Sequence, residues 1–80
     1  MLIDDGLTTT RHLRKGQWIY VNDGPIDSWV EVLGKDPRTD GSIDITFRYR
    51  NADGQAAVGE RRMSPPFTDY LLPVCREELD

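Results

Sequence analysis

The chain contains one histidine and one cysteine, His12 and Cys75, and neither lies in a recognisable catalytic or metal-binding motif. A structural zinc site would need two further carboxylate ligands from distant loops. Nucleophilic catalysis would need His12 to reach Cys75 from the opposite end of the chain. The sequence also lacks a phosphate-binding loop, a paired-histidine zinc helix and a Gly-x-Ser-x-Gly elbow. We therefore expect no catalytic residues, no metal site, no cofactor and no enzymatic activity.

Three aromatic side chains are the first candidates for binding a partner: Trp18, Tyr20 and Trp29. In a strand, Trp18 and Tyr20 share one face while Ile19 and Val21 share the other. If Ile19 and Val21 point into the core, the aromatics line an outer surface that can stack on a peptide, a base or a cationic group. The alternative is that a small core uses every aromatic residue as filling, because large apolar side chains are usually buried.

Four arginines near a predicted hairpin form the second candidate surface: Arg48, Arg50, Arg61 and Arg62. As cross-strand neighbours they would concentrate charge that contacts phosphates, while an aromatic side chain stacks on a base. The alternative is a solvated face on which Asp44 and Glu60 balance the arginines in weak surface pairs. The net charge of -4 argues against indiscriminate binding to nucleic acid, but it permits a local basic patch.

Short β-strands must position these candidates, because strand-type runs separated by turn residues recur from Gly16 onward at intervals of about 8 to 12 residues. The first runs cover residues 17–21 and 29–33. The run at residues 43–50 alternates most regularly, with polar side chains between four core candidates: Ile43, Ile45, Phe47 and Tyr49. This alternation predicts one buried and one solvated face.

A hairpin and a final strand complete the expected order of elements. The sequence Asn51-Ala52-Asp53-Gly54 predicts a tight hairpin loop in which Gly54 adopts a positive φ. The return strand, residues 55–63, contains poor strand formers, which favours an edge position. Ser64-Pro65-Pro66 ends that strand, and residues 67–70 are long enough for one 3-10 turn before the last strand.

The length of 80 residues is sufficient for one hydrophobic core and therefore for one domain. Residues 1–15 contain few apolar side chains and predict an N-terminal arm, residues 16–75 predict the β-domain, and residues 76–80 predict an acidic tail. No apolar run approaches the ~20 residues that a membrane-spanning helix needs, and the first residues lack the features of a signal peptide. A single cysteine suits a reducing compartment. We expect a cytoplasmic protein without a membrane partner.

The region from Gly16 to Val74 resembles SH3-like small β-barrels in its order of four strands, a tight hairpin between the third and fourth, a helical turn and a short fifth strand. The segment Lys15-Gly16-Gln17-Trp18-Ile19-Tyr20-Val21 is also similar to the first strand of bacterial members of that superfamily. The resemblance implies an all-β, five-stranded SH3-like barrel with a short 3-10 turn before the last strand. The loop at residues 22–27 contains no aromatic residue, so binding of proline-rich ligands is not implied.

Three functional hypotheses follow from these features. The first is a non-catalytic binding or accessory module that attaches to a protein partner through the aromatic strand face or an open sheet edge. The second is a small barrel that associates with nucleic acid through the arginines. The third is a small viral or structural subunit that assembles into a homo-oligomer.

Overall fold

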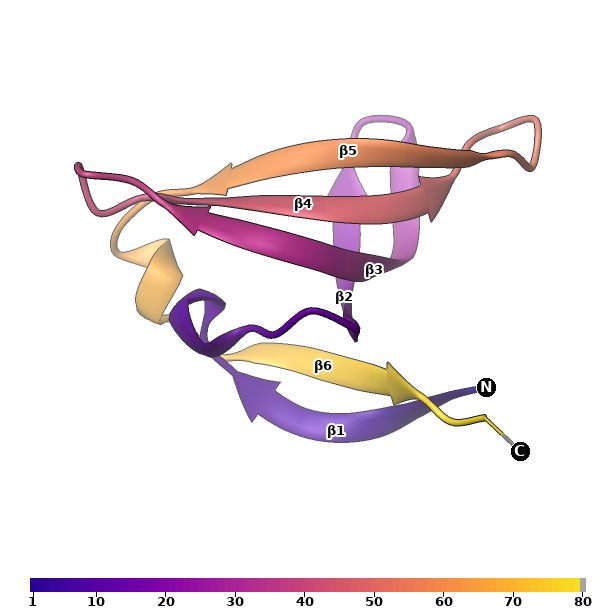
Figure 1. Ribbon diagram of the computed structural model, residues 1–80, viewed down its shortest axis with the longest axis horizontal. Helices are drawn as coiled ribbons and strands as arrows, with labels where there is room; N and C mark the ends of the chain where they lie inside the picture. The colour runs from indigo at the N-terminus through magenta and orange to yellow at the C-terminus, as the bar shows by residue number, and fades with distance from the viewer. Residues whose placement is uncertain (80) are drawn as a thin grey trace.

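Six antiparallel strands and two 3-10 turns make up the computed structural model, which describes residues 1–79 (Figure 1). The strands are β1 Leu2–Thr8, β2 Gln17–Asp23, β3 Ile26–Pro37, β4 Ile43–Arg50, β5 Ala56–Met63 and β6 Leu72–Glu77. The 3-10 turns are η1 Thr10–His12 and η2 Phe67–Asp69. The strands pair in one sheet, in the order β1-β6-β2-β3-β4-β5.

The sheet folds into two layers, with β3, β4 and β5 above β1 and β6 in the view of Figure 1. The inner faces enclose a hydrophobic core made of Leu13, Ile19, Val21, Val30, Val32, Ile45, Phe47 and Val74. Ile43 is also buried, and Tyr49 packs against the core while staying partly accessible. The buried face predicted for residues 43–50 is therefore confirmed, but the predicted solvated face is not continuous, because Asp44 is buried as well.

The predicted hairpin between β4 and β5 is present. The Asn51 N–H donates a hydrogen bond to the Gln55 carbonyl at 2.9 Å, and the Gly54 N–H donates to the Asn51 carbonyl at 2.9 Å. Gly54 has a φ of 78°, in the left-handed region that glycine adopts without strain. The return strand β5 lies at an edge of the sheet, as its composition predicted, and η2 precedes the last strand.

The prediction that residues 1–15 form a separate arm is wrong. Residues Leu2–Thr8 form β1, which pairs with β6 from Leu2 opposite Glu77 to Thr8 opposite Leu72. Leu13 belongs to the core and is 1% exposed. The expected acidic tail likewise begins inside β6. β1 could not be predicted from the sequence, because polar residues interrupt its apolar pattern and its register with β6 shifts between Asp4 and Leu7.

The all-β class is correct, but the predicted five-stranded barrel is not what the structure shows. The sheet has six strands in the described part of the chain, and its edge strands β1 and β5 do not pair with each other, so it stays open. The turns η1 and η2 meet at one end of the two layers (Figure 1). There, Arg11 Nε contacts Asp69 Oδ1 at 3.0 Å. Within residues 1–79, no helix has the length and hydrophobicity of a transmembrane span.

Candidate functional site

The three predicted aromatic residues lie on the face of the sheet opposite the core. Ile19 and Val21 are buried, so Trp18 and Tyr20 project from the other face of β2. Trp29 is the cross-strand partner of Tyr20 and therefore shares its face. Both tryptophans are half-buried, whereas Tyr20 is 49% exposed. The three aromatic residues therefore form an outer surface and do not fill the core.

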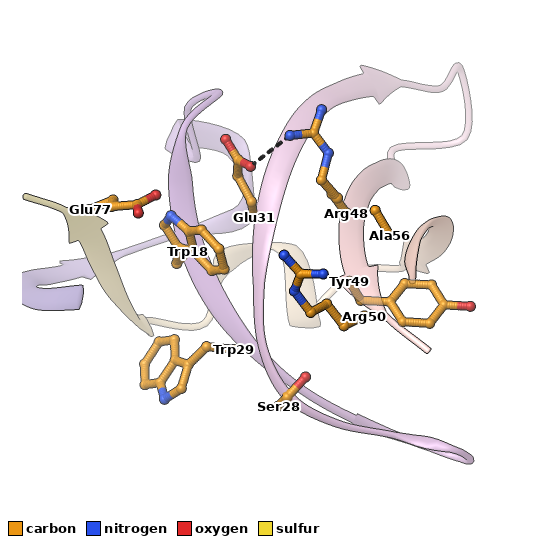
Figure 2. Close-up of a pocket in the computed structure, with 9 residues that line it drawn as sticks. All are labelled: Trp18, Ser28, Trp29, Glu31, Arg48, Tyr49, Arg50, Ala56 and Glu77. Carbon is orange, nitrogen blue, oxygen red and sulfur yellow. Dashed lines mark hydrogen bonds and ion pairs between the residues drawn. The ribbon is translucent and has the colours of Figure 1, made fainter. Parts of the chain in front are cut away.

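A shallow groove of about 470 Å³ crosses this outer face (Figure 2). We call it the tryptophan groove. Residues of five strands, β2 to β6, line it: Trp18, Ser28, Trp29, Glu31, Arg48, Tyr49, Arg50, Ala56 and Glu77. The groove thus brings two of the predicted aromatics together with two of the predicted arginines.

Glu31 and Arg48 form an ion pair within the groove. They are cross-strand partners on β3 and β4, and Arg48 Nη1 lies 3.3 Å from Glu31 Oε1 (Figure 2). Trp18 is the cross-strand partner of Glu31 on the other side, so a row of outer-face side chains runs from Arg48 through Glu31 to Trp18. A guanidinium carries five N–H donors, so Arg48 retains donors for an incoming group.

The two sides of the groove differ in charge. On the β6 side, Glu77 has no ion-pair partner within residues 1–79. It lies two residues beyond Cys75, the cross-strand partner of Trp18, and is therefore a diagonal neighbour of that indole (Figure 2). On the hairpin side, Arg50 Nη1 donates to the Gly54 carbonyl at 2.8 Å. The groove therefore has a carboxylate beside an indole at one side and an anchored guanidinium at the other.

Tyr20 supports the groove from outside. Its ring packs edge-on against Trp29, with centroids 5.8 Å apart and planes inclined at 79°. The Tyr20 hydroxyl donates a hydrogen bond to the Asp27 carboxylate. This hydrogen bond, together with partial desolvation and the carboxylate charge, raises the pKa of Tyr20 above its ordinary value of 10.0. Tyr20 is thus fixed as a neutral phenol against the Trp29 indole.

The four predicted arginines do not form one patch, which corrects the sequence prediction. In the β4–β5 ladder Arg48 lies opposite Val58, not opposite Arg61 or Arg62. Arg48 and Arg50 line the tryptophan groove, whereas Arg61 and Arg62 lie further along β5. The tight hairpin fixes this register, and neighbouring residues of a strand point to opposite faces. Arg61 therefore borders the inner side, in a small cavity with Ile19, Ile45 and Leu72.

Arg62 belongs to a second charged cluster around Asp44. Asp44 is only 7% exposed, with Arg62 Nε at 2.9 Å from Oδ1 and Arg38 Nη1 at 3.0 Å from Oδ2. The hydrogen bond from Arg62, with that from Arg38, outweighs desolvation and lowers the pKa of Asp44 below its ordinary value of 3.8. Since both guanidinium groups hold the carboxylate, this cluster joins the β3–β4 loop to β5 and has a structural role.

His12 and Cys75 contact different parts of the molecule. The His12 Nδ1 atom lies 2.8 Å from the Thr9 hydroxyl oxygen within the η1 turn. Cys75 is half-buried on β6, opposite Trp18. In the part of the chain that the structure describes, no group of three or more His, Cys, Asp or Glu side chains is arranged to hold a metal ion.

Two carboxylates of the groove, Glu31 and Glu77, were not predicted from the sequence. The position of Glu31 could have been predicted, because Glu31 follows Trp29 by two residues and therefore lies on the same face of a strand. The position of Glu77 could not be predicted from the local sequence, because it depends on the pairing of β6 with β2. An exposed apolar group at η2 was also missed: Phe67, Tyr70 and Leu71.

No protein-family model, no curated protein and no solved structure matches this chain significantly.

Proposed function

We propose that this protein is a non-catalytic binding module whose tryptophan groove takes a segment of a protein partner. The observation that carries the proposal is that Trp18 and Trp29 lie on the outer face, while the core on the other face is built without them. Partly buried tryptophans supply large apolar contact areas and are enriched among residues that dominate binding energy. Because the groove is built on strands, its side chains are held in place before the partner arrives.

We propose that the partner segment presents a lysine or arginine side chain. A cation is attracted to the face of an indole, and Glu77 places an unpaired carboxylate beside Trp18. Arg50, across the groove, suits a carbonyl or carboxylate oxygen of the same segment. The net charge of -4 adds a longer-range attraction for a basic partner.

Fluorescence polarisation with two labelled peptide pools, one centred on Lys or Arg and one on Glu, tests this proposal. We expect the basic pool to bind and the acidic pool not to bind. Trp18→Ala and Trp29→Ala should each weaken binding roughly tenfold or more, as expected for central aromatic anchors. Glu77→Gln should weaken binding of the basic pool, which separates the charge requirement from the apolar one.

Tyr70→Ala is the matched control, because Tyr70 is also an exposed aromatic residue but lies next to η2, outside the groove. It should leave peptide affinity unchanged. Variants with Trp18→Ala and Trp29→Ala that bind as tightly as the unsubstituted chain would refute the groove as the binding site. Circular dichroism of each variant establishes that the comparison is made between folded proteins.

A nucleic-acid partner is the second candidate, favoured by the presence of Arg48 and Arg50 in the same groove as Trp18. Glu31 and Glu77 in the same groove weigh against it, because they repel phosphates. Gel retardation of single-stranded oligonucleotides at low salt tests this candidate. Binding that weakens steeply as salt rises would support it, and no retardation at low salt would exclude it.

We also propose that β2 to β6 form an SH3-like unit to which β1 has been added. The order of elements supports this assignment: four strands, a tight hairpin between β4 and β5, the η2 turn and the short strand β6. The cytoplasm remains the proposed location, supported by the single cysteine.

A further inference from the structure

The outer edge of β5 is a continuous strand edge that no other strand covers within residues 1–79. Its register with β4 runs without a shift from Ala56 to Met63, and it contains no proline. The opposite edge, β1, is interrupted between Asp4 and Leu7, where the Gly6 N–H is bound by Asp4 Oδ1 at 2.9 Å. Interruptions of this kind discourage strand addition, and a regular edge permits it.

The hairpin determines which backbone groups of β5 face outward. Asn51 and Gln55 are joined by a backbone hydrogen bond, so they form a hydrogen-bonded pair of the antiparallel ladder. Such pairs alternate along the ladder, which directs the N–H and C=O groups of residues 57, 59 and 61 toward β4. The backbone N–H and C=O groups that point outward at the free edge, away from β4, are therefore those of Ala56, Val58, Glu60 and Arg62.

We propose that a second copy of this chain adds its own β5 antiparallel to this edge, with the two Gly59 residues facing each other on the two-fold axis. In this register Val58 of one copy lies opposite Glu60 of the other, and Ala56 lies opposite Arg62. Every outward backbone group from residue 56 to residue 62 then finds a partner in the second copy. The contact is isologous and closes after two copies.

The charges and the length of β5 favour this register over the two registers in which the two-fold axis is shifted by one residue. Moving the axis from Gly59 to Glu60 would place the two Glu60 carboxylates directly opposite each other, which is destabilising. Moving the axis to Val58 would place Arg62 opposite Gly54 in the hairpin loop, where the strand has ended. With the axis at Gly59, no two like charges are directly opposite along residues 56–62.

Two further observations fit a β5–β5 seam. Val58 is 65% exposed at the middle of the strand, although its apolar side chain gains nothing from water. Gly59 has no side chain to obstruct the seam, and residues at a non-hydrogen-bonded position approach most closely. The seam would also bring the second copy's Arg62 next to Ala56, at the rim of the tryptophan groove. The inference itself depends only on the β5 edge and not on the function proposed for the groove.

Sedimentation equilibrium over a wide concentration range tests the proposal. The mass should rise from 9.2 kDa toward twice that value as concentration increases. Val58→Glu places a carboxylate opposite Glu60 twice in each dimer and should weaken association roughly tenfold. Val58→Lys, a matched change at the same exposed position, should leave association intact or strengthen it. Combining Val58→Glu with Glu60→Lys should restore the dimer.

Val58→Pro and amide hydrogen exchange test whether association depends on backbone hydrogen bonds between the two β5 strands. Proline at position 58 removes a donor that points outward, so association should be lost while circular dichroism still shows the sheet. In the unsubstituted chain, exchange at Val58 and Glu60 should slow as concentration rises, whereas Ala57 and Gly59 are protected at every concentration. A mass that stays at 9.2 kDa up to roughly millimolar concentration would overturn the proposal. A dimer equally weakened by Val58→Glu and Val58→Lys would overturn the register.

Discussion

At the scale of single residues, the faces of side chains followed from alternation, and their pairing did not. Burial of Ile19 and Val21 on β2 was enough to place Trp18 and Tyr20 outside. The position of an arginine relative to residues on another strand depends on register, which the hairpin loop sets and which the alternation within a single strand does not reveal. The four arginines were therefore correctly assigned to strands but wrongly assigned to one patch.

The Asp44 cluster gives a prediction at this scale. The pKa of Asp44 is lowered in the folded protein, so its ionised form stabilises the fold at neutral pH and that stabilisation is lost as pH falls below about 4. Asp44→Asn should lower the free energy of unfolding at pH 7 and reduce its decline between pH 5 and pH 3 (roughly the window around the ordinary carboxyl pKa). Urea unfolding at several pH values measures both effects.

Asp53→Asn is the control for this prediction. Asp53 is exposed in the hairpin loop and has no ion-pair partner among the described residues. Its replacement should leave the pH dependence of stability unchanged. An Asp44→Asn variant whose stability falls with acid as steeply as that of the unsubstituted chain would show that Asp44 is not held by Arg38 and Arg62.

At the scale of elements, the strands with regular alternation were predictable and the strand created by pairing was not. Alternating apolar residues predicted β2 and β4, and turn residues predicted the hairpin loop. β1 contains Asp4, Asp5 and Gly6, and it becomes a strand because β6 offers it hydrogen-bonding partners. The same limit applies to β3, which extends to Pro37, beyond the end of its apolar run.

Gly59 gives a prediction for the packing of β5 on β4. A Cβ atom at this position would lie 2.7 Å from the Phe47 ring, closer than carbon atoms approach without displacement. Phe47 is a core residue with 3% exposure, so Gly59→Ala should lower the free energy of unfolding by about 1–3 kcal/mol. Chemical denaturation followed by tryptophan fluorescence measures this loss.

Gly34→Ala is the matched control, because a Cβ atom on Gly34 would meet no heavy atom within 4 Å. Its effect on unfolding should stay within about 1 kcal/mol. Equal destabilisation by the two substitutions would mean that the loss of glycine itself, and not the collision with Phe47, determines the effect.

At the scale of the whole molecule, an open sheet folds into two layers and leaves its outer face accessible. The extents of 36 × 26 × 17 Å leave room for one core between the layers, and the tryptophan groove is correspondingly shallow. The sequence predicted one small all-β domain and left open whether its aromatic residues face outward or fill the core. It did not predict the open form, because closure depends on how far β1 and β5 lie apart after all six strands have paired.

Two-dimensional NMR during titration with a Lys- or Arg-centred peptide tests whether the tryptophan groove is the binding surface. We expect the indole N–H signals of Trp18 and Trp29 and the amides of Glu31, Arg48 and Glu77 to shift together and saturate. Indole signals that stay in place while those of Phe67, Tyr70 and Leu71 move would contradict it.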